Sequence, residues 1–146
     1  MPIYTVSRAS TALSTSNDLL TIVASATKPL RVYLVDMKGM GTASAANSVL
    51  VSRSSGGTTG GGGITPAKLN SGAGSASFSA YTTWSAQPTL GDTLLRLGVN
   101  ANGGIDKFQA FPGGEIQIPV SGQLSIRSES GTSNVLANLI IEEVDG

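Results

Sequence analysis

Residues 111–144 read FPGGEIQIPVSGQLSIRSESGTSNVLANLIIEEV, and this stretch decides the fold that the sequence predicts. Every second residue from 116 to 120 is apolar, and a period of two is typical of a strand with one buried face. The same alternation returns at Leu124 and Ile126. After a cluster of turn residues, a long closing strand is expected from Val135 to Val144. The stretch therefore predicts antiparallel β structure.

The register between the first two strands follows from the rule that cross-strand partners share a face. A two-residue turn would place Ile118 opposite Ser125, an apolar residue opposite a polar one. A three-residue connection pairs Ile118 with Ile126 instead. We therefore expect a bulged or three-residue hairpin, with Pro119 at a sheet edge or at the bulge, because proline cannot donate to a central ladder. Ser125 is expected to contribute little to stability.

The closing strand carries apolar residues on both of its faces. Leu139, Ile140 and Ile141 are consecutive, and a continuous apolar run marks a strand that is covered on both sides. The segments Leu19–Ala24 and Leu30–Met37 share this property. Because the interior of one sandwich covers only one face of each sheet, we expect a homo-oligomer, with a trimer as the form predicted.

The rest of the chain repeats the pattern of short strands and turns. Segments such as Asp92–Val99 alternate, and clusters of Gly, Ser and Asn separate them. No helical period runs longer than a turn. Roughly eight to ten short strands over residues 1–146 predict one all-β domain, an antiparallel β-sandwich of the jelly-roll or immunoglobulin-like kind.

A glycine-rich segment interrupts this pattern. Residues 54–63 read SSGGTTGGGG and have too little side-chain surface to order by burial, so we expect a flexible loop over residues 54–66. It is not a phosphate loop, because no Gly-Lys-Ser/Thr follows and no strand-to-helix context surrounds it. Two interpretations remain open: a tolerant surface loop, and a segment that becomes ordered only against a partner.

The composition excludes most catalytic chemistry. The chain has no cysteine and no histidine, which removes disulfides, thiolate metal sites, the commonest zinc ligand and every Ser–His or Cys–His nucleophile pair. Nine basic and nine acidic residues give zero net charge without a basic stripe, so we expect no nucleic-acid partner. Apolar runs are far too short to span a membrane, and the N-terminus shows no secretory signal. We expect no enzyme activity, no cofactor and no membrane partner.

The acidic end of the closing strand and the single tryptophan are the candidate ligand sites. Glu142, Glu143 and Asp145 are either a weak cation site or the solvated end of a strand; we expect a strand end, and therefore no metal. Trp84 is the only tryptophan. It either plugs the core or its rim, or stacks on a ligand, and we expect a plug because no companion aromatic cage is evident.

The order of features along the chain supplies a resemblance. IYTV at residues 3–6 precedes KPLRVYLVDMKG at 28–39, a Gly-rich loop then runs into ITPAKLNSGAGSASFSA at 64–80, and FPGGEIQIPVSGQLSIRSESG at 111–131 leads to LIIEEV at 139–144. In this order the chain resembles bacteriophage capsid decoration, or cement, proteins with a jelly-roll fold. The resemblance implies trimers seated on the outer shell, often at threefold or quasi-threefold positions, and no catalytic residues.

We therefore expect a structural virion protein, made in the host cytoplasm, that binds the outer capsid shell and stabilises it. Its partners would be the major capsid protein and itself, as a homotrimer. The N-terminal segment and the Gly-rich loop are the expected contacts, because both are extended and free to order on a partner. The residues chosen are Pro2, Ile3, Tyr4, Arg8, Thr58, Thr59, Ile64 and Pro66.

The alternative is a carbohydrate- or receptor-binding β-sandwich of a phage fibre or head appendage. A receptor head usually needs a stalk, and no heptad or repeat is visible in this sequence. Glycan binding would also need several exposed aromatic side chains on one surface, whereas the chain has only one Trp, three Tyr and three Phe.

Overall fold

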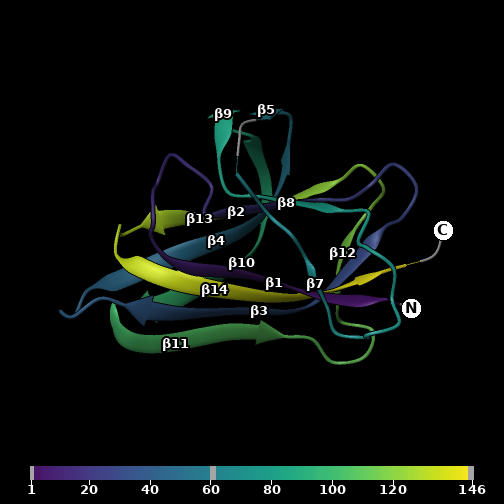
Figure 1. Cartoon of the computed structure of the whole chain (residues 1–146). Helices are drawn as coiled ribbons and strands as arrows, with labels where there is room; N and C mark the ends of the chain where they lie inside the picture. The colour runs from purple at the N-terminus through teal and green to yellow at the C-terminus, as the bar shows by residue number, and fades with distance from the viewer. Residues whose placement is uncertain (1, 60–61, 145–146) are drawn as a thin grey trace.

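The computed structural model describes residues 2–59 and 62–144, which contain fourteen strands and no helix (Figure 1). Eight of these strands have four or more residues, and the other six have two or three. The strands form two antiparallel sheets of six strands each and one separate two-stranded ribbon. The all-β antiparallel sandwich predicted from the sequence is confirmed, with more very short strands than expected.

Sheet one has the strand order β11-β3-β14-β1-β7, and β12 also pairs with β3. Its strands are β1 (Ile3–Ala12), β3 (Leu30–Met40), β7 (Ala67–Lys68), β11 (Asn102–Gln109), β12 (Ile116–Ile118) and β14 (Asn134–Glu143). Sheet two has the order β10-β4-β13-β2-β8-β6. Its strands are β2 (Leu20–Val23), β4 (Ala46–Ser55), β6 (Gly63–Ile64), β8 (Ser79–Tyr81), β10 (Thr89–Asn100) and β13 (Gln123–Ser130). The ribbon pairs β5 (Thr58–Thr59) with β9 (Trp84–Ala86).

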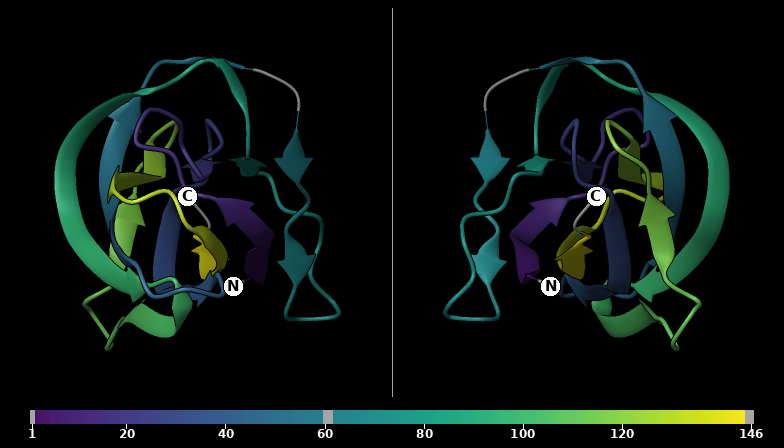
Figure 2. Two further views of the ribbon diagram at one scale, coloured as in Figure 1. Left: turned by 90° about the vertical axis from the view of Figure 1, so that its left-hand side faces the viewer. Right: turned by 90° about the vertical axis from the view of Figure 1, so that its right-hand side faces the viewer.

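The eight longer strands follow the strand order of a jelly roll. Sheet one contains the row β1-β14-β3-β11, and sheet two contains the row β2-β13-β4-β10. Along these eight strands the chain therefore changes sheet at every step except the one from β4 to β10. This pairing of early with late strands is that of two interlocked Greek keys. Figure 2 shows the two layers edge-on, with the long β10 curving around the outside.

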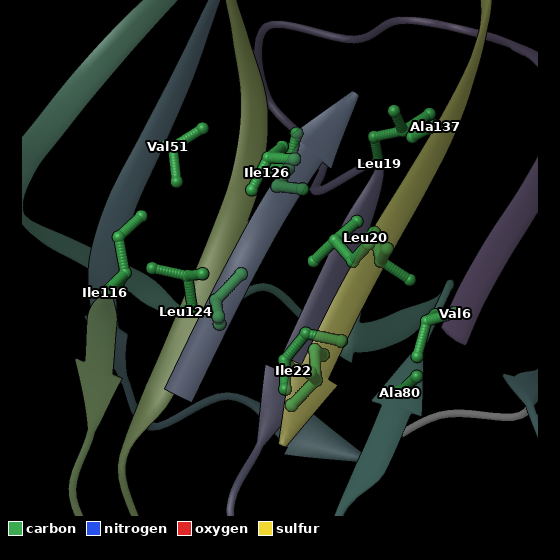
Figure 3. Packing of buried hydrophobic residues seen from close by; sticks show 14 of the residues in the cluster. Val6, Leu19, Leu20, Ile22, Val51, Ala80, Ile116, Leu124, Ile126 and Ala137 are labelled. Atoms are coloured by element: carbon green, nitrogen blue, oxygen red, sulfur yellow. The ribbon is translucent and has the colours of Figure 1, made fainter. Parts of the chain in front are cut away.

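The core lies between the two sheets. In sheet one, Leu139 pairs with Val6 on one side and Val35 on the other, and all three side chains are fully buried. In sheet two, Leu124 pairs with Ile22, and both are fully buried. Figure 3 shows such side chains from both layers gathered in one interior. Full burial stabilises the fold by about 1.5–3 kcal/mol for each side chain of this size.

The hairpin predicted for residues 116–126 is wrong. β12 pairs with β3 in sheet one, whereas β13 pairs with β2 and β4 in sheet two. Ile118 therefore lies beside Leu30, and Ile126 lies beside Leu20 and Val51. The connection crosses the sandwich instead of folding back. The alternation of apolar residues identified the buried face of each strand. Two strands of facing sheets show the same alternation as two strands of one hairpin, so the pattern could not distinguish a hairpin from a crossover.

The turn of this crossover depends on one residue with an unusual backbone. Ser121 has a positive φ of 58°, the left-handed conformation that a non-glycine residue rarely adopts. Its N–H donates to the carbonyl of Ser25 at 2.9 Å, and the N–H of Gly122 donates to that of Pro119 at 2.9 Å. These bonds fix the direction in which the chain leaves sheet one.

The closing strand is confirmed as β14, a central strand between β1 and β3. Leu139 and Ile141 face the core, and Ile140 is half-buried on the outer face, where it pairs with Leu34. Apolar residues thus occupy both faces, as the sequence indicated. No second copy of the chain is present to cover the outer face, so the homotrimer stays a prediction.

For β2, the chain covers its own outer face. Thr21 points away from the core and is nevertheless fully buried. Its Oγ1 accepts a hydrogen bond of 3.0 Å from Nε1 of Trp84 on the ribbon. The apolar residues on an outer face therefore favour an oligomer only in sheet one, because the chain itself covers the outer face of β2.

Much of the Gly-rich segment has backbone partners. β5 pairs with β9 and β6 pairs with β8. Gly60 and Gly61, which the prediction of a flexible loop includes, lie outside the described residues. The flexibility of residues 54–66 therefore remains a prediction.

Candidate docking surface

The sandwich has two open sides, each formed by the end strands of both sheets. β6 and β7 are the end strands on one side, called here the β6–β7 edge. β10, β11 and β12 are the end strands on the other, called here the β10–β12 edge. Unpaired strand edges can accept a partner, so each side is a candidate for docking.

The β6–β7 edge holds half of the residues chosen from the sequence. Ile3 and Pro66 are half-buried there, and Ile64 is half-buried against the core cluster. Tyr4 is almost fully buried: its ring packs edge-on against Phe78 with centroids 5.7 Å apart. Its hydroxyl donates to the carbonyl of Gly74 at 2.8 Å. Tyr4 is therefore a core residue and not a surface contact.

The structure separates the other chosen residues from this edge. Pro2 is half-buried and precedes β1, and Thr58 is exposed on the β5–β9 ribbon. Thr59 belongs to the same ribbon through its backbone pairing with Trp84. The expectation that the N-terminal segment is free to order on a partner is wrong for β1, because that strand pairs with β14 along most of its length.

Arg8 projects from β1 into a polar cavity of about 280 Å³, called here the Arg8 cavity. Its guanidinium NH1 donates to the backbone carbonyl of Leu19 and, at 3.4 Å, to that of Thr82. Burial lowers the pKa of Arg8 from its ordinary value, because desolvation disfavours the charged form. Arg8 is thus a partly buried cation held by neutral groups.

A buried ion pair that no sequence pattern indicates lies next to this cavity. The carboxylate of Asp18 is almost fully buried, and its Oδ1 lies 2.7 Å from Nε of Arg127. Its Oδ2 accepts hydrogen bonds from the hydroxyls of Thr21 at 2.5 Å and Ser125 at 2.6 Å. The buried carboxylate therefore has three partners for its roughly four lone-pair sites. This cluster is structural, and because Ser125 is fully buried within it, we now expect Ser125 to contribute to stability.

The acidic end of β14 is neither a shared cation site nor a solvated strand end. Glu142 and Glu143 point to opposite faces of sheet one: Glu142 pairs with Arg31 at 3.4 Å, whereas Glu143 is buried and accepts bonds from the amide and hydroxyl of Ser77. Asp145 lies outside the described residues. Within residues 2–59 and 62–144, no group of three acidic side chains could hold a metal ion.

Both carboxylates affect nearby tyrosines. The pKa of Tyr4 is raised above its ordinary value first by burial and then by the charge and hydrogen bond of Glu143. The pKa of Tyr33 is raised first by burial and then by Glu142, whose Oε1 accepts a 3.2 Å bond from the Tyr33 hydroxyl. In both cases a neighbouring negative charge opposes loss of the phenolic proton.

Trp84 occupies the rim of the sandwich, as predicted for a plug. Its Nε1 is bonded to Thr21, and its ring lies 5.1 Å from that of Tyr81, centroid to centroid. A Cβ built on Gly57 would come within 2.9 Å of the indole ring, so the Gly57 backbone packs against it. Contacts within the chain therefore occupy this ring.

The β10–β12 edge carries the apolar surface that the sequence analysis missed. A groove of about 440 Å³ opens between β10 and β12, with Leu94, Phe108 and Ile116 in its walls. A second groove of about 410 Å³ flanks the other side of β12, with Ile118 and Pro119 in its walls. Together they are called here the β12 groove. The side chain of Arg53 lines both parts and donates through NH1 to the carbonyl of Gln117.

Exposed apolar side chains lie next to wall residues of the β12 groove. Phe111 packs against Gly114, Val120 follows Pro119, and Leu94 is itself a wall residue. Phe111 is 74% exposed, Val120 is 46% exposed and Leu94 is 38% exposed. The two sheets meet tightly at the other end of this side, where the amide of Gly98 donates to Oδ2 of Asp106 at 2.9 Å. Phe111 follows β11 in a Pro-Gly-Gly turn that no strand covers, and an aromatic residue in such a turn was the sequence signal for this surface.

Comparison of the chain with protein-family models, with curated proteins and with solved structures finds no match. Over the residues that the structure describes, no helix is long and apolar enough to cross a membrane. The fold and its surfaces thus define an antiparallel β-sandwich with a partly apolar groove along one side.

Proposed function

We propose that this protein is a structural virion protein, a bacteriophage capsid decoration or cement subunit that binds the outer capsid shell and stabilises it. The observation that carries the proposal is the β12 groove. A small sandwich with only three phenylalanines leaves one of them, Phe111, 74% exposed beside apolar walls. Exposed apolar patches of this kind mark surfaces that bind other proteins. The jelly-roll strand order agrees with the resemblance to decoration proteins described above.

The chemistry of the groove favours a protein partner bound by shape and apolar burial. Burying a phenylalanine completely stabilises a contact by about 1.5–3 kcal/mol, and Leu94 and Val120 would add to this. The zero net charge means that long-range attraction contributes little, so binding should persist in high salt. The partner proposed is the major capsid protein.

The proposed homotrimer turns a modest contact into stable binding. One subunit would present a single groove, whereas a trimer would present three copies to neighbouring capsid subunits. Linked contacts of this kind raise the apparent affinity by roughly 10²–10⁴ without any new interaction. Bridging neighbouring subunits would let the particle resist heat, internal pressure or chelation. The protein would then be made in the host cytoplasm and act on the virion surface.

The receptor-binding alternative has less support. A glycan site usually offers a free aromatic face, but Tyr81 and Gly57 pack against Trp84. Phe111 is the aromatic residue that remains free to contact a partner. Tight glycan binding by the isolated protein would nevertheless favour a fibre or head-appendage role.

Rebinding to particles tests the proposal. Purified protein is mixed with phage particles that lack it, and bound protein and particle melting temperature are measured. Saturable binding with a rise in melting temperature is expected. Phe111→Ser should weaken binding at least about tenfold, which is the loss expected when one large apolar contact is removed. Ile105→Ser is the matched control, because Ile105 is 65% exposed on β11 and does not line the groove.

The same experiment compares the two open sides of the sandwich. Pro66→Ser changes the β6–β7 edge, which contains the contacts expected from the sequence. Loss of binding in Pro66→Ser with full binding in Phe111→Ser would move the docking surface to that edge. Absence of binding by the unmodified protein would contradict the proposed function.

A further inference from the structure

We propose that the Arg8 cavity is a binding site for a carboxylate group. The cavity lies between the end of β1 and the turn that joins β8 to β9. Its walls include Arg8 from β1, Asn17 and Leu19 from the connection to β2, and Thr82 and Trp84 from the opposite side. The inference rests on this cavity alone and does not depend on capsid binding, because the cavity shares no lining residue with the β12 groove.

The cavity carries one uncompensated positive charge. Its walls include one acidic side chain, Asp18, and that carboxylate is already occupied by Arg127, Thr21 and Ser125. Among the described residues that form the walls, Arg8 is the one basic residue. Within residues 2–59 and 62–144, no carboxylate lies within ion-pair distance of Arg8. A partly buried cation without a counter-ion is costly, and an anion that enters the cavity removes that cost.

The guanidinium is oriented and still has donors to offer. Both of its bonds to the chain use NH1, which donates to the carbonyls of Leu19 and Thr82. A guanidinium has five N–H groups in a rigid fork, and no acceptor in the described part of the chain takes a bond from Nε or NH2. Two parallel donors on one planar group match the two oxygens of a carboxylate. The amide side chains of Asn17 and Gln87 at the wall offer further donors.

Charge and size favour a carboxylate over a phosphate. One guanidinium balances one negative charge, whereas a phosphate at neutral pH carries between one and two. The carbonyls of Leu19 and Thr82 already accept from Arg8, and Asp18 is an acidic wall residue, so these groups would oppose the additional negative charge. A volume of about 280 Å³ accepts one acidic side chain or a small organic acid. A side chain of a partner protein and a free acid present the same group, and the experiment separates them.

Trp84 provides the probe, because it is the only tryptophan in the chain and its side chain lines the cavity. Its fluorescence is followed while sodium acetate replaces sodium chloride at constant ionic strength. We expect a saturable change with acetate, and at least about tenfold weaker binding in Arg8→Gln because the charge-assisted bonds are lost. Arg96→Gln is the matched control, since Arg96 is exposed, pairs with Glu129 and lies outside the cavity. That variant should bind acetate like the unmodified protein.

Two further measurements identify the source of the carboxylate and test the site if the Arg8 variant does not fold. Tighter binding of N-acetylglutamate than of glucuronate assigns the site to a partner's acidic side chain, and the reverse order assigns it to an acidic sugar. If Arg8→Gln does not fold, the Nε–H resonance of Arg8 in the unmodified protein must shift with acetate and not with chloride. The proposal is overturned if no acid gives a saturable response, if folded Arg8→Gln binds equally well, or if inorganic phosphate binds more tightly than every carboxylate.

Discussion

The buried pair of Asp18 and Arg127 offers the sharpest test of how this sandwich is stabilised. Asp18→Asn keeps the size of the side chain and removes its charge. The Asp18 side chain is 1% exposed and that of Arg127 is 13% exposed. Breaking a buried pair by removing one partner costs about 3–5 kcal/mol, because the remaining charge stays buried. Arg127 keeps its 3.0 Å bond to the carbonyl of Pro88, so we expect the lower end, about 3 kcal/mol.

Urea unfolding followed by the fluorescence of Trp84 measures this loss. With a slope of about 2 kcal/mol per molar urea, the midpoint should fall by about 1.5 M at unchanged slope. Asp92→Asn is the matched control, because Asp92 is exposed on β10, and its effect should stay within about 0.5 kcal/mol. A loss below about 1 kcal/mol for Asp18→Asn, or equal losses in the two variants, would refute the assignment of a buried and necessary ion pair.

Further predictions address the core, a close backbone contact and the response to alkali. Ile118→Ala should lower the free energy of unfolding by about 2–4 kcal/mol, because it leaves a cavity. Ser125→Ala should lower it by about 1 kcal/mol, because it removes a buried hydrogen bond. Urea unfolding measures both, and an unchanged stability of Ser125→Ala would contradict a structural role for the Asp18 cluster. Gly39→Ala should destabilise strongly, because its Cβ would lie 2.0 Å from a backbone oxygen, while Gly98→Ala, with nothing within 4 Å, should be nearly neutral in thermal melting. The pKa of Tyr4 is higher in the folded protein than its ordinary value of 10.0, so the unfolded chain loses the proton first. Its contribution is therefore complete below about pH 10 and decreases as the pH rises through the folded-state pKa. When the pH is raised above about 10, Tyr4→Phe should lose less stability than the unmodified protein, and an equal loss would refute this.

The fold class could be predicted because a period of two is visible in several of the longer strands. The alternation around Ile118 and Ile126 identified core-facing residues that the structure buries completely. What alternation could not supply was the sheet to which each strand belongs. Residues 116–118 and 123–130 read as a hairpin and belong to opposite sheets, since facing sheets bury equivalent faces.

The polar interactions were beyond prediction because they join residues far apart in the chain. Asp18 and Arg127 are separated by 109 positions, and nothing near either residue indicates the other. Glu143 was expected in solvent at the end of a strand, but residues 74–77 cover that end and bury it. Phe111 was visible in the sequence, and its exposure follows only from knowing that no strand passes over its turn.

The most direct test of the proposed function is a cryo-electron microscopy reconstruction of the phage particle that carries this protein. The account predicts density for the sandwich on the outer surface of the shell, with Phe111 and the β12 groove against the capsid and three copies around each threefold or quasi-threefold position. Particles prepared without the protein should lack that density and melt at a lower temperature. A shell with no density for the sandwich, or a sandwich located only at the tip of a fibre, would contradict the account.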